Sequence, residues 1–240
     1  MPGDVIVIQN SFVDLGRDAV WRCLGANNGA IPSLEGEVGS MIALGRELVR
    51  PAAIYRSLPV AGVERSRVLL DGGAALDGAF VSHCFQGARE AVAVVVTIGD
   101  ALEKKVAELF GQDMGVEAFV LDAVGTAIAF SIFDDAAERV FRETTARGWQ
   151  TGFCLRPGDS YWDITGQRAV FETVPAERIG VRLLDECAMR PQKSLSAVIP
   201  LGPDRKIHGD PDKSYCRYCK AVRCPMRTEA FEAGAVGNPA

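Results

Sequence analysis

The strongest feature of the hydrophobic pattern is the apolar run "EAVAVVVTIGD" at residues 90–100. A continuous apolar run of strand length is typical of a strand that is buried on both faces. We therefore expect this segment at the centre of a sheet. Shorter runs rich in β-branched and aromatic residues predict further strands at 5–9, 52–60 (closed by Pro59), 67–73, 153–155, 179–184 and 195–202.

After residue 100 the pattern changes to the period of a helix. Leu102, Val106 and Leu109 recur at helical spacing, and Asp100 is a suitable N-cap. A much longer helix is expected from about 113 to 147, where a glycine follows. Its first half is apolar nearly all round and its second half is amphipathic, which predicts a buried front and a solvated end. Shorter helical pieces are expected within 13–50 and at 165–174.

The order of these elements favours one fold class. Strands and helices follow each other without regular crossover helices, which is typical of an α+β domain rather than a doubly wound one. Beyond Gly202 the composition shifts to charge, proline and glycine. We therefore expect an α+β domain at 1–202 and a C-terminal tail at 203–240 whose source of order is its cysteines.

Composition narrows the class of protein. The 240 residues are 48% hydrophobic and 24% charged with a net charge of −5, as in ordinary soluble globular proteins and without a nucleic-acid footprint. No apolar run reaches the ~20 residues of a bilayer span, and acidic Asp4 near the start does not fit an export signal. Seven cysteines, three of them crowded together, fit a reducing interior better than a disulfide framework. We expect a cytoplasmic protein without nucleic-acid or membrane partners.

Conventional catalytic residues are scarce. His83 and His208 are the two histidines, and neither has a partner arrangement for nucleophilic or general-base catalysis. Asp122, inside the apolar half of the long helix, is interpreted as a structural carboxylate satisfied by a nearby cation or N–H, with a role in a site as the alternative. The protein is expected to need little proton transfer.

Two loops carry the candidate binding chemistry. "RPGDSYWD" (156–163) couples a rigid turn to Tyr161, Trp162 and two aspartates, which suits a flat, positively charged small molecule. "LLDECAMRPQKSLSA" (183–197) contains adjacent acids at one end and Lys193 at the other. The alternatives are a turn whose aromatic residues anchor it to the core, and solvated turn charges.

The same loops resemble a known family. "PGDSYWDITGQRAVFETV" and "RIGVRLLDECAMRPQKSLSAVIPLG" resemble the activation (reactivation) domain of vitamin B12-dependent methionine synthase, and its small stand-alone relatives in particular. The resemblance extends upstream through "RPAAIYRSLPV", "TIGDALEK" and "AFVLDAVGTAIA", and downstream into the cysteine tail. It implies a curved, mainly antiparallel sheet with flanking helices that binds S-adenosylmethionine.

The resemblance also implies a function. In that family the domain supports one-electron reduction of cob(II)alamin and methyl transfer from S-adenosylmethionine, which is catalysis by positioning. This chain has no segment that resembles a cobalamin, homocysteine or folate module, so cobalamin is expected on a partner. The implied partners are a corrinoid-binding protein or methionine synthase core protein, and an electron donor. The alternatives are a non-catalytic iron–sulfur or zinc docking protein for a corrinoid methyltransferase, and a relative that binds another small ligand.

The loops together with the resemblance give ten candidate cofactor-binding residues. They are Arg156, Pro157, Gly158, Asp159, Tyr161, Trp162, Asp185, Glu186, Lys193 and Ser194.

Several positions depart from the family pattern. Cys154 stands where the family has an arginine and Asp159 where it has a tyrosine, and Arg156 and Tyr161, two residues along, are the candidates to replace them. Leu184, Asp185 and Ile207 are the other departures.

The run "SYCRYCKAVRCPMR" (214–227) predicts a metal site. Cys216, Cys219 and Cys224 have the spacing C-x2-C-x4-C with a proline next, which suits thiolates around an iron–sulfur cluster or, as the alternative, zinc. A metal-free thiol tail is the third possibility. A fourth ligand is missing from the run, and the candidates are His208, Cys154, Cys187 or an exogenous group.

Overall fold

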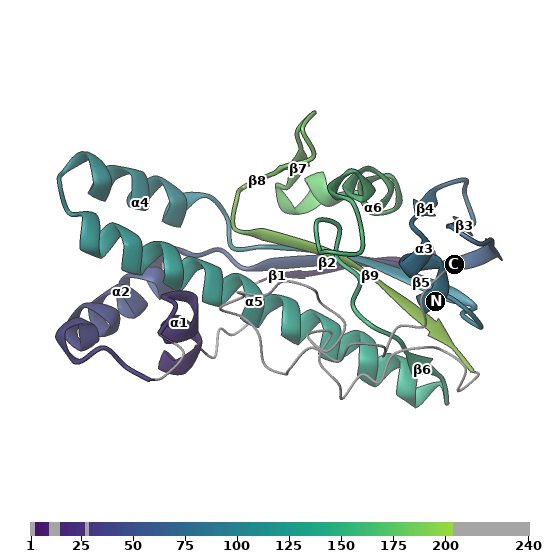
Figure 1. Cartoon of the computed structure of the whole chain (residues 1–240), viewed down its shortest axis with the longest axis horizontal. Helices are drawn as coiled ribbons and strands as arrows, with labels where there is room; N and C mark the ends of the chain where they lie inside the picture. The colour runs from purple at the N-terminus through teal and green to yellow at the C-terminus, as the bar shows by residue number, and fades with distance from the viewer. Residues whose placement is uncertain (1–2, 10–14, 27–28, 204–240) are drawn as a thin grey trace.

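The computed structural model describes residues 3–9, 15–26 and 29–203. Its main sheet has seven strands in the order β4-β3-β2-β5-β9-β6, and β1 pairs with the first half of β2 (Figure 1). Every pairing is antiparallel. The strands are β1 Val5–Gln9, β2 Ala52–Val63, β3 Arg67–Leu70, β4 Ala75–Asp77, β5 Glu90–Thr97, β6 Gln150–Thr151 and β9 Ser194–Gly202. A separate hairpin joins β7 Arg182–Leu183 to β8 Met189–Arg190.

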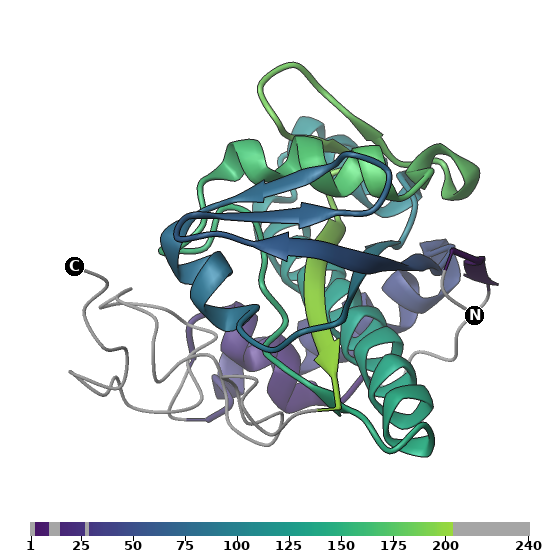
Figure 2. The same ribbon diagram turned by 90° about the vertical axis from the view of Figure 1, so that its right-hand side faces the viewer.

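The centre of the sheet is β5, as its apolar run predicts. All eight of its residues are buried, between β2 and β9. Because side chains alternate along a strand, Val92, Val94 and Val96 join one core while Ala91 and Val95 join the other. Figure 2 shows the strands turning strongly between β3 and β9, so the sheet is curved, and the expected α+β class is confirmed.

One face of the sheet is covered by a layer of helices. The long helix α5, Gly115–Ala146, runs across it and contacts α1 Arg17–Cys23, α2 Glu35–Leu48 and α4 Ala101–Gly111 (Figure 1). The expected helix at about 113–147 is therefore confirmed. Close packing depends on glycine: a Cβ on Gly125 would lie 2.6 Å from Leu102 Cδ2.

Within the described residues, α5 is the one helix long and apolar enough to cross a membrane by length and composition. In the fold, 61% of its most apolar stretch is buried, mainly against α1, α2, α4 and the sheet. The helix is thus the central helix of the core, as its pattern predicts.

The other face of the sheet carries smaller elements. They are α3 Ala79–Cys84, α6 Gln167–Thr173 and the 3-10 helices η2 Ile164–Gly166 and η3 Ala176–Ile179, while η1 Pro32–Leu34 precedes α2. Their apolar side chains form the second core with β3, β4 and the back of β2 and β5. The two cores lie on opposite faces of one sheet, so the elements described here form a layered α+β arrangement.

The bounds of some predicted strands are wrong. Pro59 does not close its strand: β2 continues to Val63. In an antiparallel strand the N–H and C=O of a residue point to the same side, and the Pro59 carbonyl accepts from the Asp71 N–H, so the missing donor faces away from β5. The expected strand at 153–155 is reduced to one bridge, Leu155 to Val198, after the two-residue β6.

The start of α4 is where the sequence predicts it. Asp100 occupies the N-cap position as predicted, but its side chain makes no capping hydrogen bond. Its carboxylate instead lies 2.6 Å from Lys104 Nζ. The tail beyond residue 203, with Cys216, Cys219, Cys224 and His208, lies outside the described residues, and its separation as a domain remains a prediction.

Candidate functional site

A half-buried polar and aromatic stripe runs along α5. Asp122, Thr126, Phe130 and Asp134 are spaced four residues apart, so they follow one side of the helix. The first three are partly buried in the middle of an otherwise apolar segment. Polar groups in such a position need partners, and two of the predicted loop residues supply contacts with this stripe.

Lys193 is the first of these residues. At the start of β9, its Nζ lies 2.8 Å from Asp122 Oδ1 and donates to Thr126 Oγ1 at 2.8 Å. The lysine side chain is 16% exposed and the aspartate 49%, so the pair lies at the rim of the core. The interpretation of Asp122 as a carboxylate satisfied by a cation is confirmed. Cys23 lies nearby: burial raises the pKa of its thiol, while the charges of Arg22 and Lys193 oppose the shift.

Arg156 is the second. Extended residues 153–156 run along the open edge of β9, with Phe153 and Leu155 in the core on the α6 side and Cys154 packed toward the α5 side. Alternation then directs Arg156 toward α5, where its guanidinium carbon lies 5.6 Å from the centre of the Phe130 ring. Arg156 and Lys193, 37 positions apart in the sequence, thus meet neighbouring turns of one helix.

The loop after Arg156 holds its side chain in place. Arg156 Nε donates to Asp159 Oδ2 at 3.1 Å, and both side chains are about a quarter exposed. The turn between them is closed by the Asp159 N–H, which donates to the Arg156 carbonyl at 3.2 Å, and the Gly158 N–H donates to the Trp162 carbonyl at 2.8 Å. Gly158 has a φ of +94°, which favours glycine, so the loop depends on this residue.

The aromatic residues of the same loop point away from the stripe. Tyr161 stacks on Phe80 with ring centres 4.5 Å apart. Trp162 is 4% exposed, and its indole lies where a Cβ on Gly166 would be, 2.4 Å from Nε1. Pro157 is buried as well. These contacts match the alternative in which the aromatic residues anchor the loop to the core.

The acidic pair of the second loop lies elsewhere. Asp185 and Glu186 are exposed at the turn of the β7–β8 hairpin, which projects beside α6 (Figure 1). Arg168 of α6 donates to the Asp185 carbonyl at 2.6 Å, so the hairpin is tied to α6 rather than to α5. Ser194 is buried, donates to the Pro191 carbonyl at 2.8 Å and lies 2.9 Å from the Thr97 hydroxyl. The ten candidates are therefore distributed over both faces of the sheet.

Two cysteines proposed as a fourth metal ligand lie within the described residues. Burial raises the pKa of the Cys154 thiol to about 11, and Arg156 opposes this shift. Cys187 is buried in the turn of the β7–β8 hairpin with a φ of +64°. Among residues 3–9, 15–26 and 29–203 there is no group of three or more His, Cys, Asp or Glu arranged to hold a metal.

Sequence reasoning missed the partners that α5 supplies. Phe130 and Asp134 were not candidates, because on a long apolar helix nothing in the pattern shows which side meets the loop. The Asp134 side chain is exposed in part. Partial burial raises the pKa of its carboxyl group, and the positive charge of Arg156 opposes the rise. The four-residue spacing of Asp122 and Thr126 within the apolar half was the available signal.

Comparison with known proteins gives the class of fold. No protein-family model matches this chain, and no curated protein matches it by sequence. Among solved structures, the chain is similar to the MetH reactivation domain, whose crystal structure contains AdoHcy. The two superpose with a TM-score of 0.64 at 14% sequence identity, over 89% of this chain and 81% of that one. The fold is thus that of the methionine synthase reactivation domain, as the resemblance implied.

Proposed function

We propose that this protein supports reductive methylation of a corrinoid cofactor held by a partner protein, with S-adenosylmethionine as the methyl donor. The observation that carries the proposal is the meeting of Arg156 and Lys193 on one stripe of α5, within a fold similar to a domain solved with AdoHcy. The extent of that similarity, 89% of the chain, supports a comparable arrangement of the ligand.

The side chains on the stripe suit the charges of the donor. A sulfonium is attracted to the face of an aromatic ring and to carboxylates, which Phe130 and Asp134 offer. A carboxylate is bound best by a guanidinium, which Arg156 offers with its orientation held by Asp159. Lys193 keeps the stripe ordered at its other end through Asp122 and Thr126. We assign Arg156 and Phe130 to ligand contact and Lys193 to positioning.

The reaction requires precise orientation of the methyl donor and the cobalt, and no proton transfer. One electron from a donor reduces cob(II)alamin to cob(I)alamin, which then attacks the sulfonium methyl group. The methyl–sulfur bond breaks as the cobalt–carbon bond forms, and S-adenosylhomocysteine leaves with the electron pair. Since no proton moves, the protein contributes by holding the methyl in line and excluding water. The scarcity of histidine agrees with this role.

A partner surface is available beside the stripe. Large apolar side chains, 38% to 58% exposed, surround the turn from α4 to α5. They are Phe110, Met114, Val116 and Phe119. Phe119 lies three residues before Asp122, so it extends the stripe by one turn. Their exposed surface is on the order of 400 Å² by the size of these side chains, half of what a stable interface buries per partner. We propose that the corrinoid protein docks here transiently, in the cytoplasm.

The cysteine tail is proposed to carry a metal centre for the electron. Cys216, Cys219 and Cys224 supply three ligands, and an iron–sulfur cluster is preferred to zinc because the reaction needs a low-potential donor. Of the proposed fourth ligands, Cys154 lies beside Arg156, and its raised pKa makes it a thiol until a metal displaces the proton. Anaerobic purification of Cys154→Ser, Cys187→Ser and His208→Ala variants, with iron, sulfide and zinc analysis, tests this. One zinc in a colourless wild type would rule out the electron-transfer role.

Calorimetry with S-adenosylmethionine tests the binding site directly. The full chain is expected to bind it with a dissociation constant between micromolar and millimolar. Arg156→Met is expected to weaken binding at least ~10-fold, the value of one charged hydrogen bond. Arg142→Met is the control, because Arg142 pairs with Glu138 on the exposed side of α5. Equal binding by both variants would remove Arg156 from the site.

A second candidate is a non-catalytic docking protein with a metal in its tail. It is favoured by the packing of Tyr161 and Trp162 into the core and by Cys154 and Asp159 at the positions where the family has arginine and tyrosine. This candidate predicts no heat with S-adenosylmethionine, with or without a corrinoid partner, but a stable complex with that partner. The same titration therefore separates the two functions.

A further inference from the structure

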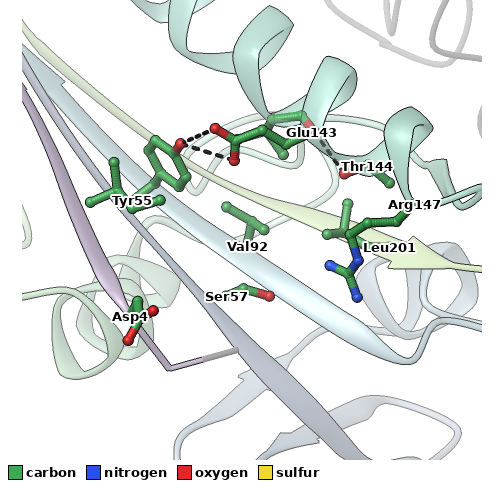
Figure 3. A pocket seen from close by; sticks show the side chains of 10 residues that line it. Asp4, Tyr55, Ser57, Val92, Glu143, Thr144, Arg147 and Leu201 are labelled. Atoms are coloured by element: carbon green, nitrogen blue, oxygen red, sulfur yellow. Dashed lines mark hydrogen bonds between the residues drawn. The ribbon is translucent and has the colours of Figure 1, made fainter. Parts of the chain in front are cut away.

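A cavity lies at the opposite end of α5 from the proposed donor site. Its volume is about 270 Å³, and it opens between the last two turns of α5 and the sheet (Figure 3). Figure 3 shows Glu143 and Arg147 reaching into it from the helix, above Tyr55, Ser57 and Val92 of the sheet. Sites for drug-sized ligands occupy ~300–1,000 Å³, so this one suits a smaller molecule.

The floor of the cavity is apolar. Ile6, Val92, Val140 and Leu201 line it from β1, β5, α5 and β9, and the Tyr55 ring completes it. Val92, Val140 and Leu201 are each less than 4% exposed, so they form a surface held by the core around it. A ligand with a short hydrocarbon part would be held by this floor.

Arg147 places a fixed positive charge on one side of the cavity. Arg147 donates to both carboxylate oxygens of Glu90, at 2.6 and 2.9 Å, and Glu90 also accepts from Ser57 at 2.8 Å. The guanidinium carbon of Arg147 lies 4.1 Å from the centre of the Trp149 ring. Glu90 is 6% exposed, and its pKa is lowered chiefly by the hydrogen bonds from Arg147. Two of the five guanidinium N–H groups make these bonds, and the 40% exposed side chain has others to donate.

Glu143 places a fixed negative charge one helical turn before Arg147. Tyr55 Oη lies 2.9 and 3.1 Å from the two oxygens of Glu143, and Arg139 Nε lies 3.0 Å from Oε1. Glu143 and Arg147 are four residues apart on α5, so their side chains share one wall of the cavity. Asp4 adds a second carboxylate at the rim. The wall thus offers carboxylates and a guanidinium side by side.

We propose that this cavity binds a free α-amino acid with an apolar side chain. A purely anionic ligand would meet both Asp4 and Glu143, and a purely cationic one would be placed against Arg147. A zwitterion satisfies both, with its carboxylate on Arg147 and its ammonium on Glu143. Its side chain then covers Val92, Val140 and Leu201. The proposal is independent of the corrinoid function.

Three ligands of one shape test the proposal on the full chain. Leucine, its decarboxylated amine 3-methylbutylamine and its deaminated acid 4-methylpentanoate are titrated up to about 10 mM, where even weak binding is visible. The readouts are calorimetry and the fluorescence of Trp149, which stacks on Arg147. Leucine is expected to bind at least ~10-fold more tightly than either analogue, because each lacks one charged contact.

Variants connect the binding to the cavity. Val140→Phe fills the floor and is expected to abolish binding, while Val140→Ile, the matched control, keeps it. Glu143→Gln has the same shape and is expected to weaken leucine ~10-fold. If Val140→Phe does not fold, Glu143→Gln is the variant that tests the proposal. The proposal is overturned if no apolar amino acid binds, if the amine or the acid binds as tightly as leucine, or if Glu143→Gln binds leucine unchanged.

Discussion

The two ends of α5 meet charged partners in different environments. Toward its start, Asp122 pairs with Lys193 while 49% exposed, and Asp134 stays open to solvent near Arg156. Toward its end, Arg147 pairs with Glu90, whose side chain is 7% exposed and buried beside β5. Open pairs contribute little to stability and leave charge available to a ligand, whereas a buried pair is costly to break. The Asp122–Lys193 pair is therefore expected to matter for binding of the methyl donor, and the Arg147–Glu90 pair for folding.

The largest effect is expected from breaking the buried pair. Arg147→Ala leaves Glu90 charged and without its main partner, which should cost about 3 kcal/mol of unfolding free energy, since Arg147 itself is 40% exposed. Urea denaturation measures the loss. Glu90→Gln in the same chain should restore most of it by removing the orphan charge. A double variant no more stable than Arg147→Ala would contradict the assignment of the cost to Glu90.

A change in proton affinity is expected at the neighbouring tyrosine. Burial, followed by the Glu143 hydrogen bond, raises the pKa of Tyr55 from 10 to about 12. Because the pKa in the folded state lies above that of the unfolded chain, the stabilisation is complete below pH 10 and is lost as pH rises through 12. Ultraviolet titration of the tyrosines checks this value. Tyr55→Phe should remove one late-titrating group, and an unchanged titration curve would count against the shift.

At the open end, Lys193 is expected to affect binding more than folding. Lys193→Met should weaken S-adenosylmethionine about 10-fold by releasing Asp122 and Thr126, with less than about 1 kcal/mol lost in stability. Lys104→Met is the control, because Lys104 pairs with Asp100 on an exposed helix start. If Lys193→Met destabilised the fold as much as Arg147→Ala, the contrast between the ends would fail.

The smallest effect is expected at the Arg156–Asp159 pair. Asp159→Asn keeps the shape of the side chain and removes the charge that orients the guanidinium. We expect about 0.5 kcal/mol in stability and a few-fold loss of ligand affinity, since both side chains are partly exposed. Differential scanning calorimetry and ligand titration measure the two quantities. Unchanged affinity would show that Arg156 needs no positioning partner.

The sequence predicts those parts of the fold that local patterns determine. The apolar run of β5 and the changing amphipathicity of α5 specify their burial, because periodicity reports which sides of an element are covered. The strand expected at 153–155 and the end expected at Pro59 fail for one reason. Both depend on which neighbour the backbone pairs with, and that neighbour, Val198 or Asp71, is set by tertiary structure.

The candidate site was predictable only in part. Arg156 and Lys193 stand out in their loops, but their partners on α5 become visible only when the helix is placed against β9. Glu90 and Arg147 are 57 residues apart, and a glutamate at the edge of an apolar run resembles an ordinary strand end. Pairing between charges that are far apart in the sequence produces no periodic pattern, so no sequence pattern predicted the cavity.

The most direct test of the proposed function follows the corrinoid itself. The protein is incubated anaerobically with a cob(II)alamin-loaded partner, a strong reductant and S-adenosylmethionine, and the visible spectrum is recorded. We predict that the cob(II)alamin spectrum gives way to that of methylcobalamin, with one S-adenosylhomocysteine formed per cobalt, and that Arg156→Met slows this change. A spectrum that stays that of reduced corrinoid, with no S-adenosylhomocysteine, would contradict the proposed function.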